Sequence, residues 1–243
     1  PYTNKKLTFD GKIYRSESGR EFVVKNNIPR FCSPENYSES FGYQWNKFDR
    51  TQLDSFSNSD LSSSRFWATT NWNPEELRDQ NVLEVGSGAG RFSEVFLKST
   101  KASLYSLDFS SAVDANLRNN SDNSSRLKLV QASIYEMPFK DETFDKIFCF
   151  GVLQHTPSFK KSVYALLKKL KTNGEVVVDF YPSKGLITRI HSKYLLRPFT
   201  KRIPKKILLL LISKTIKISL FLFDLLCFLK LGILIRFLPI TDV

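Results

Sequence analysis

Short apolar runs and amphipathic runs alternate through the middle of the chain. From residue 81 onward, uninterrupted apolar segments are each followed by a segment whose apolar residues recur with the helical period. We predict strands at 81–85, 103–107, 127–131, 144–150 and 175–180, and helices at 91–98, at 111–119 and after Thr156 and Pro157, the last stopped by Asn173 and Gly174. Strands that lack alternation and are each followed by a helix predict a doubly wound α/β domain, with a mainly parallel sheet covered on both faces.

The region before this domain shows two other patterns. Residues 7–9 and 13–14 flank Asp10-Gly11, a strong signal for a two-residue hairpin turn, and residues 21–25 predict a third strand. Residues 35–70 are rich in serine and aromatic residues and are predicted to form helices that pack on the domain that follows. A capping asparagine, a proline and two acids at 73–76 predict one more helix start.

Composition excludes several classes of protein. Of the 243 residues, 42% are hydrophobic and 25% are charged, which is typical of a folded globular protein and excludes a disordered chain. Cys32, Cys149 and Cys227 lie far apart and form no CxxC pair. The sequence therefore excludes a disulfide scaffold and a cysteine zinc site, and it favours a reducing, cytoplasmic compartment.

Charge is distributed unevenly along the chain. Residues 1–183 carry 24 basic and 22 acidic residues, whereas residues 184–243 carry 12 basic and 2 acidic residues and are the most apolar part. Because the basic residues there are interleaved with leucine, isoleucine and phenylalanine, an anionic lipid surface suits them better than nucleic acid. We expect residues 184–238 to form two or three amphipathic helices, as a lid over the ligand site of the preceding domain that can rest peripherally on a membrane surface. A membrane span within 207–238 is the disfavoured alternative, since it would bury two charges.

A glycine-rich turn directly after the first predicted domain strand carries the candidate chemistry. Glu84 lies in that strand, and Gly86, Gly88 and Gly90 follow in a G-x-G-x-G pattern before the next helix. Backbone without side chains lets a ligand approach a helix N-terminus, and parallel sheets bind ligands at the carboxyl ends of their strands. Asp108 ends the neighbouring strand, 22 residues after Gly86, where an acid could bind a ribose diol.

The rival interpretation of this turn is a dinucleotide-binding oxidoreductase. Its G-x-G-x-x-G fingerprint requires a small third residue for close helix packing, and Arg91 occupies that position when the pattern is read from Gly86. An acid at Glu84, in the strand just before the loop, is also foreign to the dinucleotide pattern. The sequence therefore disfavours this alternative.

Residues 84–90 resemble the first motif of class I S-adenosylmethionine-dependent methyltransferases. Further segments match that family in order and spacing: the end of strand two at 107–110, the segment after strand three at 131–139, the strand-four motif at 144–155, and the helix and turn into strand five at 167–174. The resemblance covers roughly residues 75–181. It implies the Rossmann-like methyltransferase fold and methyl transfer with S-adenosylmethionine as the cofactor.

The resemblance also implies roles for individual residues. The backbone of 86–90 and the Glu84 side chain would hold the methionine end of the cofactor, Asp108 would bind the ribose, and Phe109 would pack on the adenine. Ser133 and Ile134 would border the base, although Phe109 and Ile134 suit the hydrophobic core nearly as well. The implied cofactor-binding residues are Glu84, Gly86, Ser87, Gly88, Gly90, Asp108, Phe109, Ser133, Ile134 and Gly151.

His155 is the candidate catalytic base. The resemblance places it just beyond strand four, beside the cofactor sulfur, and an imidazole suits proton removal from an acceptor hydroxyl near neutral pH. The alternative is a histidine that caps or packs the start of the next helix. The sequence holds no Asn-Pro-Pro-Tyr motif, typical of methylation at amide or base nitrogen, which favours a small-molecule, sugar or lipid-linked acceptor methylated at oxygen. The second functional hypothesis is a membrane-associated binding module with a degraded cofactor pocket.

These patterns divide the chain into a β unit at 1–34, a methyltransferase core at 35–183 and the basic segment at 184–243. The first part resembles the zinc-ribbon-like segment that precedes some methyltransferase domains, but Thr3, Arg15 and Ser18 stand at the ligand positions, so we expect no zinc there. The class I fold normally ends with an antiparallel strand pair after strand five. We expect this pair to be missing, through truncation or because this member lacks it, since no counterpart is recognisable before Val243.

Overall fold

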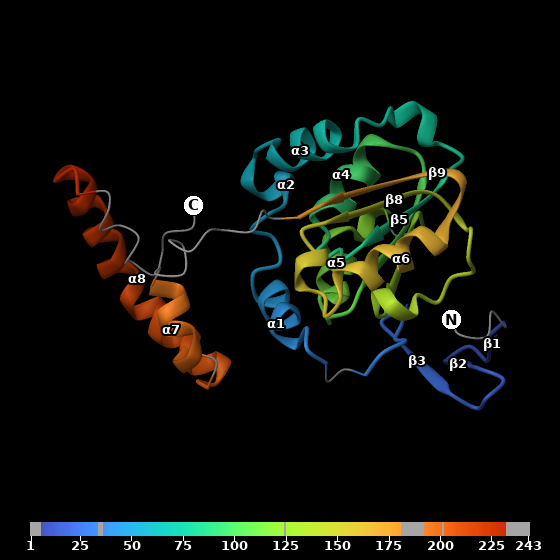
Figure 1. Cartoon of the computed structure of the whole chain (residues 1–243), viewed down its shortest axis with the longest axis horizontal. Coiled ribbons are helices and arrows are strands. Elements are labelled where there is room, and N and C mark those ends of the chain that lie inside the picture. Colours follow the sequence, from blue (N-terminus) through green and yellow to red (C-terminus); the bar gives the residue numbers. More distant parts are fainter. Residues whose placement is uncertain (1–5, 34–35, 124, 181–191, 201, 232–243) are drawn as a thin grey trace. The chain divides into compact units, whose positions relative to one another are not determined.

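The computed structural model of the chain describes residues 6–33, 36–123, 125–180, 192–200 and 202–231 (Figure 1). The chain divides into two compact units, Pro1–Tyr181 and Pro182–Val243. Every described strand belongs to the first unit, and the described part of the second unit is helical.

A five-stranded parallel sheet forms the centre of the first unit (Figure 1). Its strands lie in the order β7-β6-β5-β8-β9, and their bounds are β5 Asn81–Val85, β6 Ser103–Asp108, β7 Leu127–Gln131, β8 Phe144–Phe150 and β9 Leu170–Asp179. β5 pairs with β6 on one side and with β8 on the other, so the strand order reverses at β5. In such sheets a ligand crevice opens at this point, beyond the carboxyl ends of the strands. The predicted doubly wound α/β fold is confirmed.

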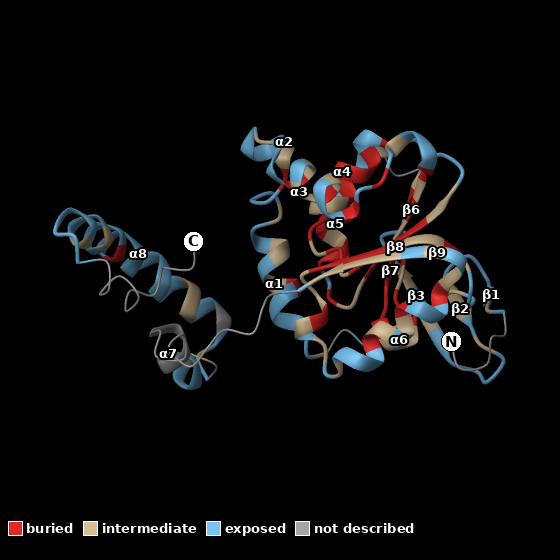
Figure 2. Ribbon diagram, turned by 45° about the horizontal axis from the view of Figure 1, so that its top comes forward, coloured by how far each residue is buried: buried red, intermediate tan, exposed pale blue. Residues whose placement is uncertain are grey.

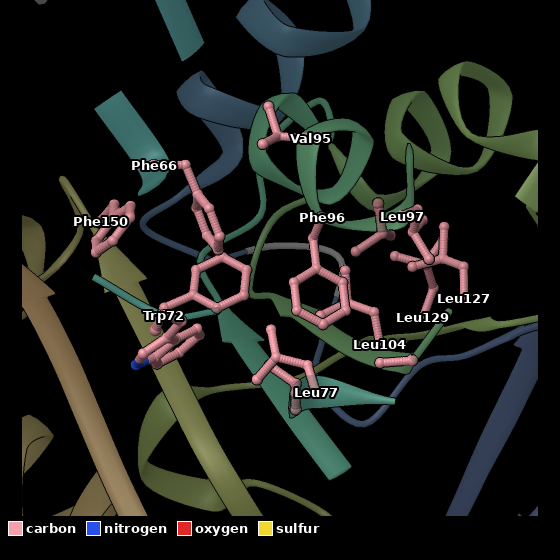
Figure 3. Close-up of a cluster of buried hydrophobic side chains, with 14 of the residues drawn as sticks. Phe66, Trp72, Leu77, Val95, Phe96, Leu97, Leu104, Leu127, Leu129 and Phe150 are labelled. Atoms are coloured by element: carbon pink, nitrogen blue, oxygen red, sulfur yellow. The ribbon is translucent and has the colours of Figure 1, made fainter. Parts of the chain in front are cut away.

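Helices cover both faces of this sheet. Their bounds are α3 Leu61–Thr70, α4 Arg91–Ser99, α5 Val113–Asn119 and α6 Phe159–Lys169. One apolar cluster joins Val82 and Phe148 of the strands to residues of α3, α4 and α5, and Figure 3 shows the Phe66 ring of α3 within it. A second cluster joins Leu83 and Ile147 to α6. Because neighbouring residues of a strand point to opposite faces, both faces are apolar, which explains the uninterrupted apolar runs.

The end of α6 differs from the prediction. The helix stops at Lys169, and β9 begins at Leu170, so Asn173 and Gly174 lie inside the strand. Leu170 pairs with Phe144, and a shift in the β8–β9 register follows before Glu175 pairs with Lys146. Asn173 adopts a φ of 64° in this irregular stretch. The Asn-Gly signal therefore marks a strand irregularity, because pairing with β8 starts before it.

The start of α6 also differs. Ser158, rather than Thr156 or Pro157, caps the helix, and its hydroxyl accepts a hydrogen bond from the backbone N–H of Lys161.

After β9, no antiparallel strand joins this sheet among the residues that the structure describes.

A small antiparallel sheet, ordered β1-β2-β3-β4, precedes the central sheet. Its strands are β1 Thr8–Phe9, β2 Ile13–Arg15, β3 Glu21–Lys25 and β4 Ile28–Pro29. Asp10 shapes the predicted hairpin turn, since its Oδ1 accepts from the backbone N–H groups of Lys12 and Ile13. The unit joins the edge of the central sheet, where the backbone N–H of Phe31 donates to the carbonyl of Gln131 at 2.7 Å.

Arg30 fixes this junction through buried hydrogen bonds. Its guanidinium donates to the carboxylate of Asp114 at 2.7 Å and to the side-chain oxygen of Gln131 at 2.9 Å, and the Arg30 side chain is only 8% exposed. Removing one member of a buried ion pair leaves the other charge without compensation.

We therefore expect Arg30→Met to lower the free energy of unfolding by about 3 kcal/mol. The matched control is Arg15→Met, because Arg15 pairs with Asp10 and Glu21 on the surface and should contribute less than about 1 kcal/mol. Urea unfolding followed by circular dichroism measures both. Equal losses for the two variants would contradict the structural role assigned to Arg30.

The serine- and aromatic-rich region forms helices, as predicted. They are α1 Glu39–Lys47, α2 Asp54–Ser57 and α3, and a 3-10 helix at Pro74–Leu77 follows, with Asn73 as its cap. The aromatic residues of this region do not share one environment: Phe66 is fully buried, whereas Phe56 is 61% exposed.

The described part of the second unit consists of α7 Ser192–Thr200 and α8 Lys205–Phe228. Within the part of the chain that the structure describes, no helix has both the length and the apolar character needed to cross a bilayer. The disfavoured alternative, a span within 207–238, is therefore not found among the described residues, which end at 231.

Candidate active site

A cavity of about 340 Å³ opens at the carboxyl ends of β5, β6 and β8. The glycine-rich loop after β5 and the last residue of β6 form one part of its wall, and the turn after β8 forms another. The residues named from the sequence that line it are Gly86, Ser87, Gly88, Asp108, Phe109, Gly151 and His155. The sheet topology thus brings together segments that are up to 69 positions apart in the chain, from Gly86 to His155.

The loop after β5 requires glycine for two reasons. Gly86, Gly88 and Gly90 have φ values of 83°, 51° and 89°, which side chains rarely adopt. A Cβ on Gly86 would lie 2.1 Å from Cγ2 of Val152. The backbone N–H groups of Gly86 and Ser87 both donate to the carbonyl of Leu107, at 2.7 and 3.2 Å, so the loop is fixed against β6.

Asp108 is oriented by hydrogen bonds to both of its carboxylate oxygens. Oδ2 accepts from the backbone N–H of Gly88 at 2.8 Å, and Oδ1 accepts from the backbone N–H and the hydroxyl of Ser110, each at 2.7 Å. Burial raises the pKa of this carboxyl, and the hydrogen bonds act in the opposite direction. Oδ2 keeps acceptor capacity toward the cavity, so Asp108 can bind a hydroxyl group of a ligand.

Ser87 brings a hydroxyl without a protein partner to the cavity. The residue is 6% exposed, and within the described part of the chain its Oγ makes no hydrogen bond. A buried hydroxyl in this state costs free energy until a ligand or a water completes its hydrogen bonds. This atom is therefore available to a polar group bound above the loop.

Glu84 lies beneath the loop and not on the cavity wall, contrary to the expected direct contact with a cofactor. The residue is 3% exposed, and its Oε2 accepts from the hydroxyls of Ser93 in α4 and Ser106 in β6. Along β5, Glu84 shares the face of Val82, which is directed toward α4. The carboxylate is therefore enclosed between the sheet and the helix that follows the loop.

Two asparagines extend this buried polar network to the loop backbone. Asn116 donates to the hydroxyls of Ser93 and Ser106, at 2.8 and 3.3 Å, and its Oδ1 accepts from Asn120 at 2.9 Å. Asn120 also donates to the carbonyl of Gly90 at 3.2 Å. Gly90 itself caps α4 and does not line the cavity, because its Cα faces these asparagines. The network supports the loop from below.

Burial raises the pKa of Glu84 to about 7, against the hydrogen bonds from Ser93 and Ser106 that lower it. The ordinary pKa of this carboxyl is 4.5, so between pH 4.5 and about pH 7 the folded chain holds a proton on Glu84 that the unfolded chain has lost. The contribution of Glu84 to stability is therefore present below pH 4.5 and is lost as the pH rises through 7.

We expect Glu84→Gln to flatten the dependence of unfolding free energy on pH between about 5 and 8, removing a fall of about 3 kcal/mol. Urea unfolding at a series of pH values measures this. Glu142→Gln, at an exposed position, is the matched control and should keep the wild-type slope. An unchanged slope in Glu84→Gln would show that this carboxyl does not titrate in the window.

Ser133 and Ile134 are not part of the cavity wall. The hydroxyl of Ser133 caps the 3-10 helix Ile134–Glu136 by accepting from the backbone N–H of Tyr135 at 3.2 Å. Ile134 is 5% exposed and belongs to the second apolar cluster. The expectation that both residues border the base does not match this geometry, whereas the core alternative for Ile134 does.

His155 lies on the cavity wall, in an exposed position at the end of a short 3-10 helix. Its ring centroid is 5.2 Å from that of Phe41 in α1. Since Ser158 is the cap of α6, His155 does not fill the capping role considered as its alternative. The imidazole is therefore beside the space where a ligand would bind.

The sequence did not single out most of the remaining wall. Phe41 and Trp45 come from α1, and Tyr37 lies just before this helix. Arg65 and Arg91 come from α3 and α4. Trp45 lies directly over the loop, since a Cβ on Gly88 would be 3.4 Å from its Nε1. The aromatic run at 41–48 is the available signal in the sequence, although it suits the predicted packing on the domain equally well. Nothing in the local sequence distinguishes the two arginines from surface residues.

Arg65 connects the wall to the last strand. Its guanidinium pairs with the carboxylate of Asp179 at the end of β9, and the other oxygen of Asp179 accepts from the backbone N–H of Gly151. The turn after β8 is thereby fixed, as the loop after β5 is fixed by Leu107.

Comparison with known proteins identifies a methyltransferase domain within the first unit of the chain. The sequence profile of the family described as "Methyltransferase domain" matches residues 83–178. A tRNA U34 carboxymethyltransferase of Nautilia profundicola is 30% identical over 104 residues, which cover 42% of this chain and 35% of that protein. Phosphoethanolamine N-methyltransferase 2 of Caenorhabditis elegans is 26% identical, covering 42% and 24%, and a ubiquinone biosynthesis O-methyltransferase of Pseudomonas entomophila is 28% identical, covering 52% and 57%.

The chain thus spans between 24% and 57% of the length of these three relatives. The matched segment begins in β5 and ends in β9, and it contains the glycine-rich loop, Asp108 and His155. Residues 83–178 of the chain therefore form a methyltransferase domain of the class I S-adenosylmethionine-dependent type, whose methyl donor is S-adenosylmethionine.

Proposed function

We propose that this chain transfers a methyl group from S-adenosylmethionine to an oxygen of a small-molecule, sugar or lipid-linked acceptor. The observation that supports it best is the cavity between the glycine-rich loop and Asp108, with the unpartnered hydroxyl of Ser87 on its wall. A loop without side chains, a free hydroxyl and an oriented carboxylate fit a ligand that combines an amino acid with a ribose.

In this proposal the residues of the loop and of β6 hold the cofactor. Gly86 and Gly88 leave room for the methionine end, and the hydroxyl of Ser87 completes its hydrogen bonds there. Oδ2 of Asp108 accepts from a ribose hydroxyl, and the ring of Phe109 packs on the adenine. Gly151 borders the same space from the turn after β8.

The bound cofactor supplies a methyl group on a positively charged sulfur, which is transferred by in-line displacement. The acceptor oxygen would gain this methyl group as the carbon–sulfur bond breaks, and the electron pair of that bond would stay on sulfur. His155 takes the proton from the acceptor hydroxyl. The wall residues of α1 exclude water and align the acceptor, which is the main contribution an enzyme makes to this reaction.

The names of the three relatives do not agree on one acceptor. They refer to tRNA U34, to phosphoethanolamine and to ubiquinone biosynthesis. The test is therefore a screen. The full chain is incubated with S-adenosylmethionine carrying a labelled methyl group and with lipid, glycan and small-molecule extracts. Label in an alkali-stable ether or similar oxygen-linked product supports the proposal, and label only on nitrogen or carbon would contradict the oxygen assignment.

We expect His155→Asn to reduce methyl transfer by about 100-fold, because general bases typically contribute factors of this size. Affinity for S-adenosylhomocysteine should change by less than about twofold, since His155 is assigned to the acceptor and not to the donor. His191→Asn is the control, because His191 is the other histidine of the chain and lies outside the matched residues 83–178, and it should leave the rate unchanged. A rate that falls only in proportion to cofactor affinity would contradict the role of His155 as a base.

A further inference from the structure

An apolar stripe runs along α8 in the C-terminal unit and faces solvent. Its residues are spaced three, four or seven positions apart, so they share one side of the helix. They are Ile207, Leu211, Ile218, Phe221, Leu225 and Phe228, each between 40% and 83% exposed. Leu210 and Leu222, on either flank, are also exposed, which makes the apolar face broader than a single row.

The other side of α8 is covered in part. Leu208, Leu209, Phe223 and Leu226 are half-buried and Ser219 is 8% exposed, whereas Ile212, Ile216 and Leu220 on that side are exposed. Figure 2 shows the same contrast, with exposed colouring along most of α8 and a buried position on it. The stripe is therefore the most continuous exposed apolar row of α8 among the described residues.

Basic side chains accompany the stripe. Lys214 lies within the row, Lys206 and Lys217 lie on one flank, and all three are exposed. α7 and the segment before α8 add exposed Arg197 and Arg202. Among the described residues of this unit, Asp224 is the one acidic residue.

We propose that α8 lies on the surface of a bilayer that contains anionic lipid, with the stripe in the acyl boundary and the lysines at the headgroups. Lysine stems can lie along apolar surface while their ammonium groups reach phosphate, so Lys214 is compatible with its place in the row. A broad apolar face beside clustered lysines has the composition of a membrane-surface helix.

A second copy of the chain is the competing occupant of the stripe. Pairing α8 with itself would bring Lys214 and its neighbours close to their own counterparts, and like charges oppose that contact. Anionic headgroups instead neutralise the same lysines. The charge pattern therefore favours lipid over self-association.

The test uses sedimentation of the full chain with phosphatidylcholine vesicles and with vesicles that also contain phosphatidylglycerol. We expect binding to the anionic vesicles that weakens as salt rises, and little binding to the neutral ones. Phe221→Ser/Phe228→Ser should lower the partition coefficient by at least about tenfold. The matched control is Phe56→Ser, an exposed phenylalanine of α2 that is 61% exposed and should leave binding unchanged.

Two further measurements keep each outcome decisive. Circular dichroism of the double variant shows that its helices are retained, and unchanged binding of S-adenosylhomocysteine shows that the first unit is folded, since these positions do not line the cavity. Sedimentation equilibrium without lipid tests for self-association. Binding that ignores lipid charge, binding unaffected by the double variant, or a stripe-dependent dimer that does not bind vesicles would each overturn the proposal.

Discussion

The Asp108→Ala variant is expected to lose at least about 100-fold in affinity for S-adenosylmethionine. A hydrogen bond to a charged acceptor contributes about 1.5–3 kcal/mol, and the upper part of this range corresponds to a factor of 100 in affinity. Asp108 also accepts from the backbone N–H of Gly88, so the variant loses an anchor of the glycine-rich loop as well. Equilibrium dialysis with labelled cofactor measures the loss.

Two variants separate binding from folding. Asp122→Ala removes an exposed carboxylate outside the cavity and should bind like the wild type. Asp108→Asn keeps the shape of the side chain but presents one acceptor oxygen where the carboxylate had two, so it should also bind weakly. Unchanged affinity in Asp108→Ala, with a folded chain, would remove the ribose assignment.

The Gly86→Ala variant is expected to lose about 3 kcal/mol of stability. Its cofactor binding is expected to fall below the measurable level. The φ of 83° costs an alanine about 1 kcal/mol or more, and the overlap of its Cβ with Val152 adds about 1–3 kcal/mol. Any shift that relieves the overlap moves the loop or Val152, and both line the cavity. Urea unfolding and equilibrium dialysis measure the two effects.

The chain offers a matched control for backbone strain alone. Gly11 has a φ of 95°, and a Cβ there would meet no atom within 4 Å, so Gly11→Ala should cost only about 1 kcal/mol and leave cofactor binding intact. The double variant Gly86→Ala/Val152→Ala should recover part of the stability, because it removes the overlap and keeps the strain. Equal losses in Gly86→Ala and Gly11→Ala would show that Val152 does not restrict the loop.

The central sheet was predictable because its strands are buried on both faces. Such strands appear as uninterrupted apolar runs, and the run at β8, with Phe144, Phe148 and Phe150, is an example. The end of α6 was not predictable from Asn173-Gly174, since the pairing of Leu170 with Phe144 depends on the neighbouring strand. Local turn signals are overridden where a tertiary pairing begins before them.

The site was predictable where it follows directly from a strand end. Gly86, Asp108 and Gly151 follow or end neighbouring strands, so the sheet alone brings them together. Tyr37 and Arg65 could not be predicted, because their place on the wall depends on the path of the helices before the sheet. The alternation of side chains along β5 does place Glu84 on the same face as Val82. That pattern could have shown that Glu84 does not line the cavity.

Isothermal titration calorimetry of the folded, full chain with S-adenosylhomocysteine tests the central claim most directly. The account predicts saturable binding at one site per chain, competition by S-adenosylmethionine, and no heat from NAD, because the loop carries Arg91 where a dinucleotide fingerprint needs a small residue. A folded chain that gives no heat with either sulfur compound, or that binds NAD instead, would contradict it.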